Sequence, residues 1–151
     1  IAKKLSRKII EKKIIIVNDF YRKLLKRKPK IAILGLNPHN DEFRNKSEEK
    51  KIILPAIKKL KKNNYRVIGP FPADTIFLNK KKYMYDVIIG MYHDQVLAPF
   101  KTIYGFDAIN VTLGLKYIRV SPDHGIAKDI AGSNKANPLS LIKAIEFIFK
   151  I

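Results

Sequence analysis

The three histidines of this chain are its clearest candidates for chemistry, because each follows an apolar stretch typical of a buried strand. His39 follows IAILGLNP, His93 follows DVIIGMY and His124 follows YIRVSPD. In open α/β folds, the loops at the carboxyl ends of the strands surround the ligand crevice. Imidazole is a common ligand of zinc and similar ions, and a catalytic metal site uses about three protein ligands. His39 and His93 are therefore predicted as metal ligands, with hydrogen-bonded surface histidines as the alternative.

Three aspartates accompany these histidines. Asp74 follows a turn rich in proline and glycine in GPFPADTIF. There it could ligate a metal, orient a histidine or act as an acid or base, and its other interpretation is the N-cap of a short helix. Asp94 and Asp123 each adjoin a histidine in the sequence. Both are interpreted either as partners that orient these histidines or as ordinary turn aspartates.

Lys101 and Arg119 stand out because they lie in a stretch with little charge. Residues 84–126 contain three basic and four acidic side chains. A lysine point charge and a planar arginine fork that meet in one crevice suit a phosphate or carboxylate ligand, and Asn110 could add a neutral donor. Surface ion pairing is the alternative. The chain has no GxGxxG or GxxxxGK[ST] loop, so a dinucleotide would have to bind by another design.

Helices and strands that could position these residues alternate along the chain. Apolar residues recur at helical spacing through residues 2–27, which predicts an amphipathic helix. Short strands are predicted at 31–36, 65–68, 86–91, 109–113 and 117–120. The pattern is typical of an α/β layered fold with a largely parallel sheet. We expect a single α/β region over residues 1–151, with a basic helix at 1–28 leading into it.

Two further helices are predicted by their capping residues. One begins at Ser47 and should be kinked at Pro55. The last is capped by Asn137 and begins at Pro138. Its core side is expected to consist of the large apolar residues Leu141, Ile142, Ile145, Phe147 and Ile148.

The net charge of +18 raises the question of nucleic-acid binding. Residues 1–30 hold twelve basic and two acidic side chains, and the whole chain has 25 lysines but six arginines. Arginine forks and interleaved aromatic residues, which read bases, are scarce, so lysine-rich solvated surfaces are the favoured interpretation over a basic nucleic-acid-binding module. No apolar run suits a membrane span. The lack of cysteine excludes disulfides and thiolate metal sites, and a cytoplasmic location is expected.

Five sequence blocks occur in a fixed order: GLNPH, GPFPADTIF, YDVIIGMYHDQ, INVTLGLKYIRVSPDHG and DIAG. Together they resemble the 4-hydroxythreonine-4-phosphate dehydrogenase family, from about Lys30 to the end of the chain. The resemblance implies the fold of the isocitrate and isopropylmalate dehydrogenases, which bind NAD without a GxGxxG loop. It also implies a homodimer with the active site at the subunit interface.

The implied reaction is the oxidation of 4-phosphooxy-L-threonine with NAD or NADP, followed by loss of carbon dioxide. It gives 3-amino-2-oxopropyl phosphate, in the biosynthesis of pyridoxal 5'-phosphate (vitamin B6). The implied metal is zinc, with magnesium or cobalt as alternatives. By resemblance, His39 and His93 match two of the three metal ligands. The substrate-binding residues of the family fall on Lys101, Asn110 and Arg119. Asp74 matches an aspartate close to the substrate, and His124 belongs to a hallmark block without being a metal ligand.

Two departures from the family affect what can be expected. The third metal histidine and a His-Thr pair belong to a region that precedes this sequence in the family. We therefore expect the chain to be the C-terminal portion of a longer two-lobed dehydrogenase, inactive by itself. The glycine-rich run after His39 is replaced by NDEFRNKSEE, so the loop and the substrate choice can differ. A paralogue acting on 4-phospho-threonate or 4-phospho-erythronate would keep the same residues.

Overall fold

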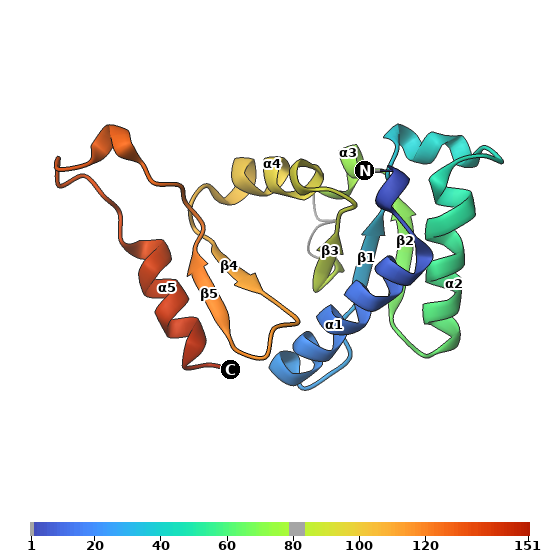
Figure 1. Cartoon of the computed structure of the whole chain (residues 1–151), viewed down its shortest axis with the longest axis horizontal. Helices are drawn as coiled ribbons and strands as arrows, with labels where there is room; N and C mark the ends of the chain where they lie inside the picture. Colours follow the sequence, from blue (N-terminus) through green and yellow to red (C-terminus); the bar gives the residue numbers. More distant parts are fainter. Residues whose placement is uncertain (1, 79–83) are drawn as a thin grey trace. The chain divides into compact units, whose positions relative to one another are not determined.

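The computed structural model describes residues 2–78 and 84–151. The chain is built of two compact units, Ile1–Pro99 and Phe100–Ile151. Helix α4, His93–Tyr104, contributes to both units. The α/β region predicted from the sequence thus consists of two units, whose elements are drawn in Figure 1.

The first unit contains a three-stranded parallel sheet with the strand order β2-β1-β3. Its strands are β1 (Ile31–Leu34), β2 (Val67–Phe71) and β3 (Val87–Ile89). Every residue of the central strand β1 is fully buried. A parallel strand covered on both faces needs an uninterrupted apolar run, which IAIL provides. The predicted α/β fold with parallel strands is therefore confirmed for this unit.

Helices α1 (Arg7–Leu25) and α2 (Leu54–Lys62) cover one face of this sheet. Successive strand side chains point to opposite faces, so Ile31 and Ile33 share one side of β1. They pack in one cluster with Ile14 of α1 and with the buried residues of α2. This cluster is the main hydrophobic core of the first unit.

The opposite face of the sheet carries the elements that lie closest to the candidate site. Ala32 and Leu34 point to this side and pack with Ile76 of the short helix α3, Ala73–Ile76. Val96 in the first turn of α4 packs against the same cluster. The first unit is therefore a three-layer α/β/α arrangement.

The first long helix is shorter than predicted. It begins at Arg7 rather than near residue 2, because the Ser6 side chain accepts a hydrogen bond from the Ile9 N–H at 3.3 Å and caps the helix there. A separate 3-10 turn, Ala2–Lys4, precedes it. The helix predicted from Ser47 with a kink at Pro55 is interrupted by a change of helix type. A π-helical turn, Glu49–Ile53, passes into α2 just before the proline, which has no N–H to continue the ladder.

Asp86 joins the end of α1 to the beginning of β3. Its carboxylate accepts two hydrogen bonds from the Arg27 guanidinium, at 2.6 and 2.7 Å, and one from the Lys30 N–H at 2.7 Å. The hydrogen bond from Arg27 is the main reason why the pKa of Asp86 lies below its ordinary value. Partial burial opposes this shift, and the Lys30 N–H adds to it.

We expect the free energy of unfolding of Asp86→Asn to decrease less than that of the wild type as the pH falls into the acid range. A depressed pKa means that the contribution of Asp86 to stability is present above the unfolded-state pKa and is lost as pH falls through the folded-state pKa. Urea unfolding of the wild type and of Asp86→Asn between neutral pH and about pH 3 measures the difference. The difference in free energy of unfolding between the wild type and Asp86→Asn should become smaller below about pH 4. A gap that stays constant with pH would show that this carboxylate is not coupled to folding.

The second unit is a hairpin packed against one helix. Strands β4 (Ile109–Thr112) and β5 (Arg119–Pro122) pair antiparallel, and they contact α5, Leu139–Ile148. Both strands were predicted, but β5 lies two residues later than expected. The hairpin forms a separate two-stranded sheet, so the parallel arrangement is restricted to the first unit.

Helix α5 corrects one prediction about the core. The buried residues of this helix are Ser140 and Ala144, which are four residues apart and therefore lie on one stripe of the helix. The predicted core side is wrong for four of its five members, since Leu141, Ile142, Ile145 and Ile148 are 46–48% exposed, whereas Phe147 is partly buried. The small side chains face the hairpin, and the large ones lie beside that contact. The helix begins one residue later than predicted, so Pro138 and not Asn137 occupies the N-cap position. Asn137 still accepts a hydrogen bond from the Leu139 N–H at 2.9 Å.

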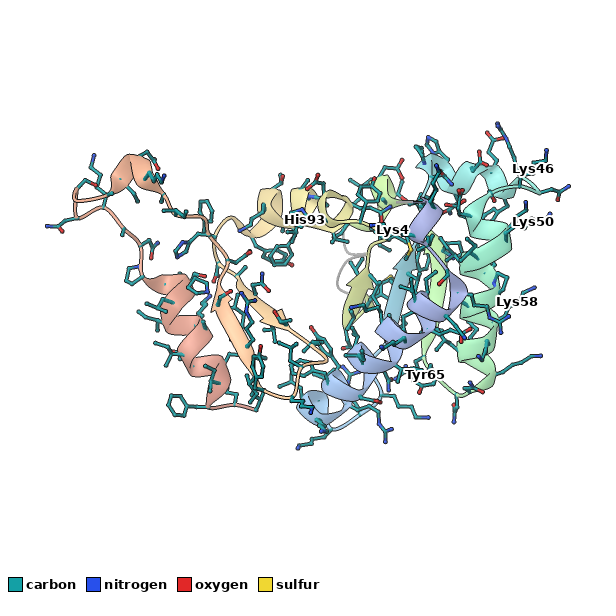
Figure 2. All side chains as sticks on the ribbon, viewed as in Figure 1. Lys4, Lys46, Lys50, Lys58, Tyr65 and His93 are labelled. Atoms are coloured by element: carbon teal, nitrogen blue, oxygen red, sulfur yellow. The ribbon has the colours of Figure 1, made fainter. Side chains whose placement is uncertain are left out.

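Lysine side chains surround the first unit. Lys46, Lys50 and Lys58 are exposed, and Figure 2 shows them pointing outward along the α2 side.

Within the described part of the chain, no helix combines the length and the apolar character that a bilayer crossing requires.

Candidate functional site

His39 and His93 follow neighbouring parallel strands, as predicted. His39 lies in a 3-10 turn, Pro38–Phe43, after β1, and His93 is the first residue of α4 after β3 (Figure 2). The carboxyl ends of parallel strands meet at one edge of the sheet. Both side chains are more than three-quarters exposed, at 76% and 77%. The two imidazoles are therefore accessible to a ligand at the same edge.

Each of these histidines has a carboxylate beside its Nδ1 atom. Asp74 Oδ2 lies 3.9 Å from His39 Nδ1, and Asp94 Oδ1 lies 2.7 Å from His93 Nδ1. The Asp94 contact has hydrogen-bond length, whereas the Asp74 contact is longer than a hydrogen bond. A carboxylate hydrogen-bonded to Nδ1 fixes the ring and leaves Nε2 available for a metal, as at His93. The interpretation of Asp74 as a helix N-cap is wrong, because α3 begins one residue earlier, after Pro72.

The imidazole and carboxylate groups near this edge are of the types that bind a divalent metal, but too few of them lie together to hold one. Imidazole and carboxylate are ordinary ligands of zinc. Across residues 2–78 and 84–151, however, no three histidine, aspartate or glutamate side chains gather as a metal site would require. A metal held by His39 and His93 would therefore need at least one ligand from outside the described residues.

Gln95 connects the two loops that carry these histidines. This side chain is 7% exposed. Its Nε2 donates to the carbonyl of Gly35 at 2.6 Å, and its Oε1 accepts from the Met91 N–H at 2.7 Å. Gly35 directly follows β1, and Met91 follows β3. Both hydrogen bonds are buried or partly buried, so Gln95 fixes the spacing of the two loops. Sequence analysis did not single out this residue.

The Glu49 side chain stabilises the loop before His39 through hydrogen bonds to its backbone. It is fully buried, and its carboxylate accepts hydrogen bonds from the N–H groups of Leu36 and Asn37 at 2.7 and 2.8 Å. Burial raises the pKa of Glu49, but the hydrogen bonds from Asn37 and Leu36 outweigh burial and keep the pKa below its ordinary value. The prediction of a helix from Ser47 did not mark Glu49 as a buried residue. Its position four residues before the buried Ile53 was the signal that its side chain points inward.

The loop that carries His39 has an unusual backbone. Five consecutive residues, His39–Phe43, have φ between 47° and 57°, in the left-handed region. For residues other than glycine this conformation costs about 1–2 kcal/mol each. The buried Asn40 stabilises it by donating from Nδ2 to the carbonyl of Pro70 at 3.2 Å. Gly35 leaves room for Asn40, because a β-carbon at Gly35 would lie 2.0 Å from Asn40 Oδ1. The loop thus adopts a left-handed turn although these five residues include no glycine.

Asn110 and Arg119 lie on the same face of the β4–β5 hairpin. Asn110 is paired with Ser121, and Thr112 is paired with Arg119. Side chains directly opposite each other, and those two residues apart, share a face of the sheet. Arg119 Nη1 donates to Thr112 Oγ1 at 2.9 Å. Two predicted substrate ligands are thus grouped with two hydroxyl groups, which the alternation of polar residues in INVT and RVSP would have indicated.

Lys101 forms an ion pair with Asp123. Its Nζ lies 2.7 Å from Asp123 Oδ2 and also donates to the Asp123 carbonyl. Of the two interpretations of Asp123, the one as a partner that orients the adjacent histidine is therefore wrong, because the carboxylate pairs with Lys101. His124 Nδ1 instead lies 3.0 Å from the carbonyl of Gly125, and its side chain is exposed.

The candidate residues are divided between the two units. The first unit holds His39, Asp74, His93 and Asp94, whereas the second holds Lys101, Asn110, Arg119, Asp123 and His124. Within each unit, residues far apart in the sequence are brought together. A single crevice shared by both groups stays a prediction.

Comparison with known proteins gives a consistent result. The family described as "Pyridoxal phosphate biosynthetic protein PdxA" matches residues 1–148. A 4-hydroxythreonine-4-phosphate dehydrogenase from Bradyrhizobium diazoefficiens is 53% identical over 79% of this chain and 35% of its own length. One from Xanthobacter autotrophicus is 46% identical over 91% of this chain and 39% of its own length. The chain therefore spans less than half the length of these relatives.

Solved structures resemble the chain over nearly its whole length. A putative 4-hydroxythreonine-4-phosphate dehydrogenase from Salmonella typhimurium has a TM-score of 0.80 at 40% identity, covering 99% of this chain and 46% of its own. A terephthalate 1,2-cis-dihydrodiol dehydrogenase from Burkholderia xenovorans has a TM-score of 0.75 at 28% identity, covering 98% of this chain and 47% of its own. The same fold thus occurs in dehydrogenases whose substrates differ.

Proposed function

The chain belongs to the family of the pyridoxal phosphate biosynthetic protein PdxA, and from this premise we propose that it is the C-terminal part of a 4-hydroxythreonine-4-phosphate dehydrogenase. The observation that carries the proposal is the family match over residues 1–148, together with relatives of which this chain spans 35–43%. The unit of activity in this proposal is the complete protein, of which this chain is one part. It is a cytoplasmic homodimer with the site at the subunit interface.

The proposed reaction is the oxidation of 4-phosphooxy-L-threonine with NAD, followed by decarboxylation. The substrate hydroxyl carbon loses a hydride to NAD and the hydroxyl loses its proton, which leaves a 3-oxo acid. The bond to the carboxylate then breaks, carbon dioxide leaves, and protonation gives 3-amino-2-oxopropyl phosphate. A divalent ion, zinc in this proposal, would be held partly by His39 and His93 and would supply Lewis-acid chemistry to both stages.

The side chains of this chain divide the remaining work. Asp94 orients the His93 imidazole through the 2.7 Å contact with Nδ1, and the Asp74 carboxylate lies 3.9 Å from His39 Nδ1, near enough for an electrostatic contact. Arg119 presents a planar fork to the phosphate or carboxylate of the substrate, and Asn110 on the same hairpin face adds a neutral donor. Lys101 contributes a further hydrogen bond, and together these groups hold the reacting carbon in place.

The alternative proposal is a paralogous dehydrogenase with another phosphorylated substrate. The Burkholderia xenovorans structure shows that the fold accommodates another substrate at 28% identity. The loop after His39 also has its own sequence, NDEFRNKSEE. A paralogue acting on 4-phospho-threonate or 4-phospho-erythronate would use the same phosphate ligands.

A comparison of kcat/KM for the three substrates, each assayed separately, tests the proposal. The complete protein should show its highest kcat/KM with 4-phosphooxy-L-threonine, measured as NAD reduction under identical metal conditions. A higher kcat/KM with either phosphorylated sugar acid would transfer the assignment to the paralogue. NADP in place of NAD, measured in parallel, identifies the nicotinamide cofactor.

A further inference from the structure

Lys101 is restrained in a way that surface lysines are not. Its side chain is 32% exposed and that of Asp123 is 16% exposed. A lysine ammonium has three N–H donors. Two acceptors from one residue, the Asp123 carboxylate and the Asp123 carbonyl, contact Lys101 Nζ. The Phe106 ring lies 4.9 Å away, measured from Nζ to the ring centroid. Among the contacts within residues 2–78 and 84–151, two of the three donors of Lys101 are used and the third is directed by them toward a ligand.

Asp123 is itself held by a buried hydroxyl. The Asp123 N–H donates to Ser140 Oγ at 3.0 Å, and Ser140 Oγ donates to the carbonyl of Ala108 at 2.5 Å. Ser140 is 2% exposed and lies in the first turn of α5. Ala108, directly before β4, is 9% exposed. A chain of hydrogen bonds therefore connects the start of β4, helix α5, the segment after β5 and the end of α4, all within the second unit.

We propose that Asp123 is a positioning residue for Lys101 and that Ser140 fixes Asp123 in turn. The inference rests on the proposed function, in which Lys101 contacts the anionic substrate, and it adds a role for two residues outside the predicted ligand set. The charges of Lys101 and Asp123 offset each other, whereas the partner of Arg119 is the neutral Thr112 hydroxyl. Arg119 thus supplies most of the attraction for an anion, and Lys101 supplies a directed hydrogen bond.

Acetylation of the lysines tests the positioning without any need for activity. A second pair, Lys143 with Asp107, lies in the same unit and serves as the matched control. In Asp123→Asn, mass spectrometry after limited acetylation should show Lys101 reacting about tenfold faster, the factor that corresponds to one lost charge-assisted hydrogen bond, with Lys143 unchanged. In Asp107→Asn, Lys143 should react faster and Lys101 should not change. An unchanged Lys101 rate in Asp123→Asn would overturn the proposal.

A second variant separates positioning from general loosening. If Asp123→Asn accelerates both lysines, the unit has loosened, and Asp123→Glu then decides, because it keeps the carboxylate. Lys101 must return toward its wild-type rate in Asp123→Glu, and failure to do so overturns the proposal. Ser140→Ala should raise the Lys101 rate by a smaller factor than Asp123→Asn.

Kinetics of the complete protein test the consequence for substrate binding. Asp123→Asn should raise KM for 4-phosphooxy-L-threonine about tenfold with a smaller change in kcat, and it should add nothing further in a Lys101→Met background. An equal effect in both backgrounds would contradict positioning through Lys101. If the complete protein does not oxidise this substrate at all, the proposed function fails, while the acetylation result still decides whether Asp123 restrains Lys101.

Discussion

Replacing His93 by alanine in the complete protein should lower metal-dependent turnover by about a thousandfold or more. His93 follows β3, next to the strand that precedes His39, and its side chain is 77% exposed. Its Nδ1 faces Asp94 at 2.7 Å, which leaves Nε2 for a metal. A bound metal contributes several kcal/mol to reactions of this kind, and each 1.4 kcal/mol corresponds to a factor of about ten. Removing one ligand from a site that already needs a ligand from outside the described residues should empty it.

Zinc content and turnover measured on the same preparations check this prediction. The matched control is His124→Ala, which removes an exposed histidine that is not expected to bind the metal. It should retain zinc, and its dimer, like that of His93→Ala, should stay intact in gel filtration. Asp94→Asn should weaken metal binding about 10–100-fold through the orientation of the ring. Wild-type zinc content and turnover in His93→Ala would refute the assignment of this ligand.

Arg119→Ala should reduce kcat/KM for the phosphorylated substrate about 100-fold. Arg119 is the cation on the exposed hairpin face that it shares with Asn110, and a hydrogen bond between charged groups contributes up to about 3 kcal/mol. Arg119→Lys keeps the charge but loses the planar fork, so about a tenfold loss is expected. Steady-state kinetics with 4-phosphooxy-L-threonine measure both variants.

The control for Arg119 is another exposed arginine. Arg66→Ala removes one positive charge from the first unit, outside the substrate-binding set. It should change kcat/KM little. Equal losses in Arg66→Ala and Arg119→Ala would show that the long-range positive field of the protein, rather than a directed contact from Arg119, attracts the substrate.

The sequence predicted the elements whose pattern is local. The continuous apolar run IAIL specifies a strand buried on both faces, and β1 is that strand. The placement of His39 and His93 after neighbouring strands followed from the same pattern. Helix α4 was not predicted, because Pro99 interrupts its helical pattern, yet the helix continues through it. Proline lacks the N–H that continues the ladder, so surrounding packing has to compensate.

Contacts between distant segments could not be predicted in the same way. Gln95 binds the Gly35 carbonyl 60 residues away, and no local pattern marks a glutamine for that role. The pairing of Asp123 with Lys101 and not with its neighbour His124 is also set by tertiary structure. The amphipathic pattern of α5 identified its large apolar residues but not which side chains would meet the hairpin. Such partners depend on which helices and strands pack together, and the hydrophobic periodicity of the sequence carries no information on that.

The most direct test of the account is to supply the complete protein with 4-phosphooxy-L-threonine, NAD and zinc, and to measure reduced NAD and released carbon dioxide together. We predict that both products form in equal amounts and that a chelator abolishes both. If a folded, complete protein reduces no NAD with this substrate in the presence of zinc, magnesium or cobalt, the proposed activity is wrong.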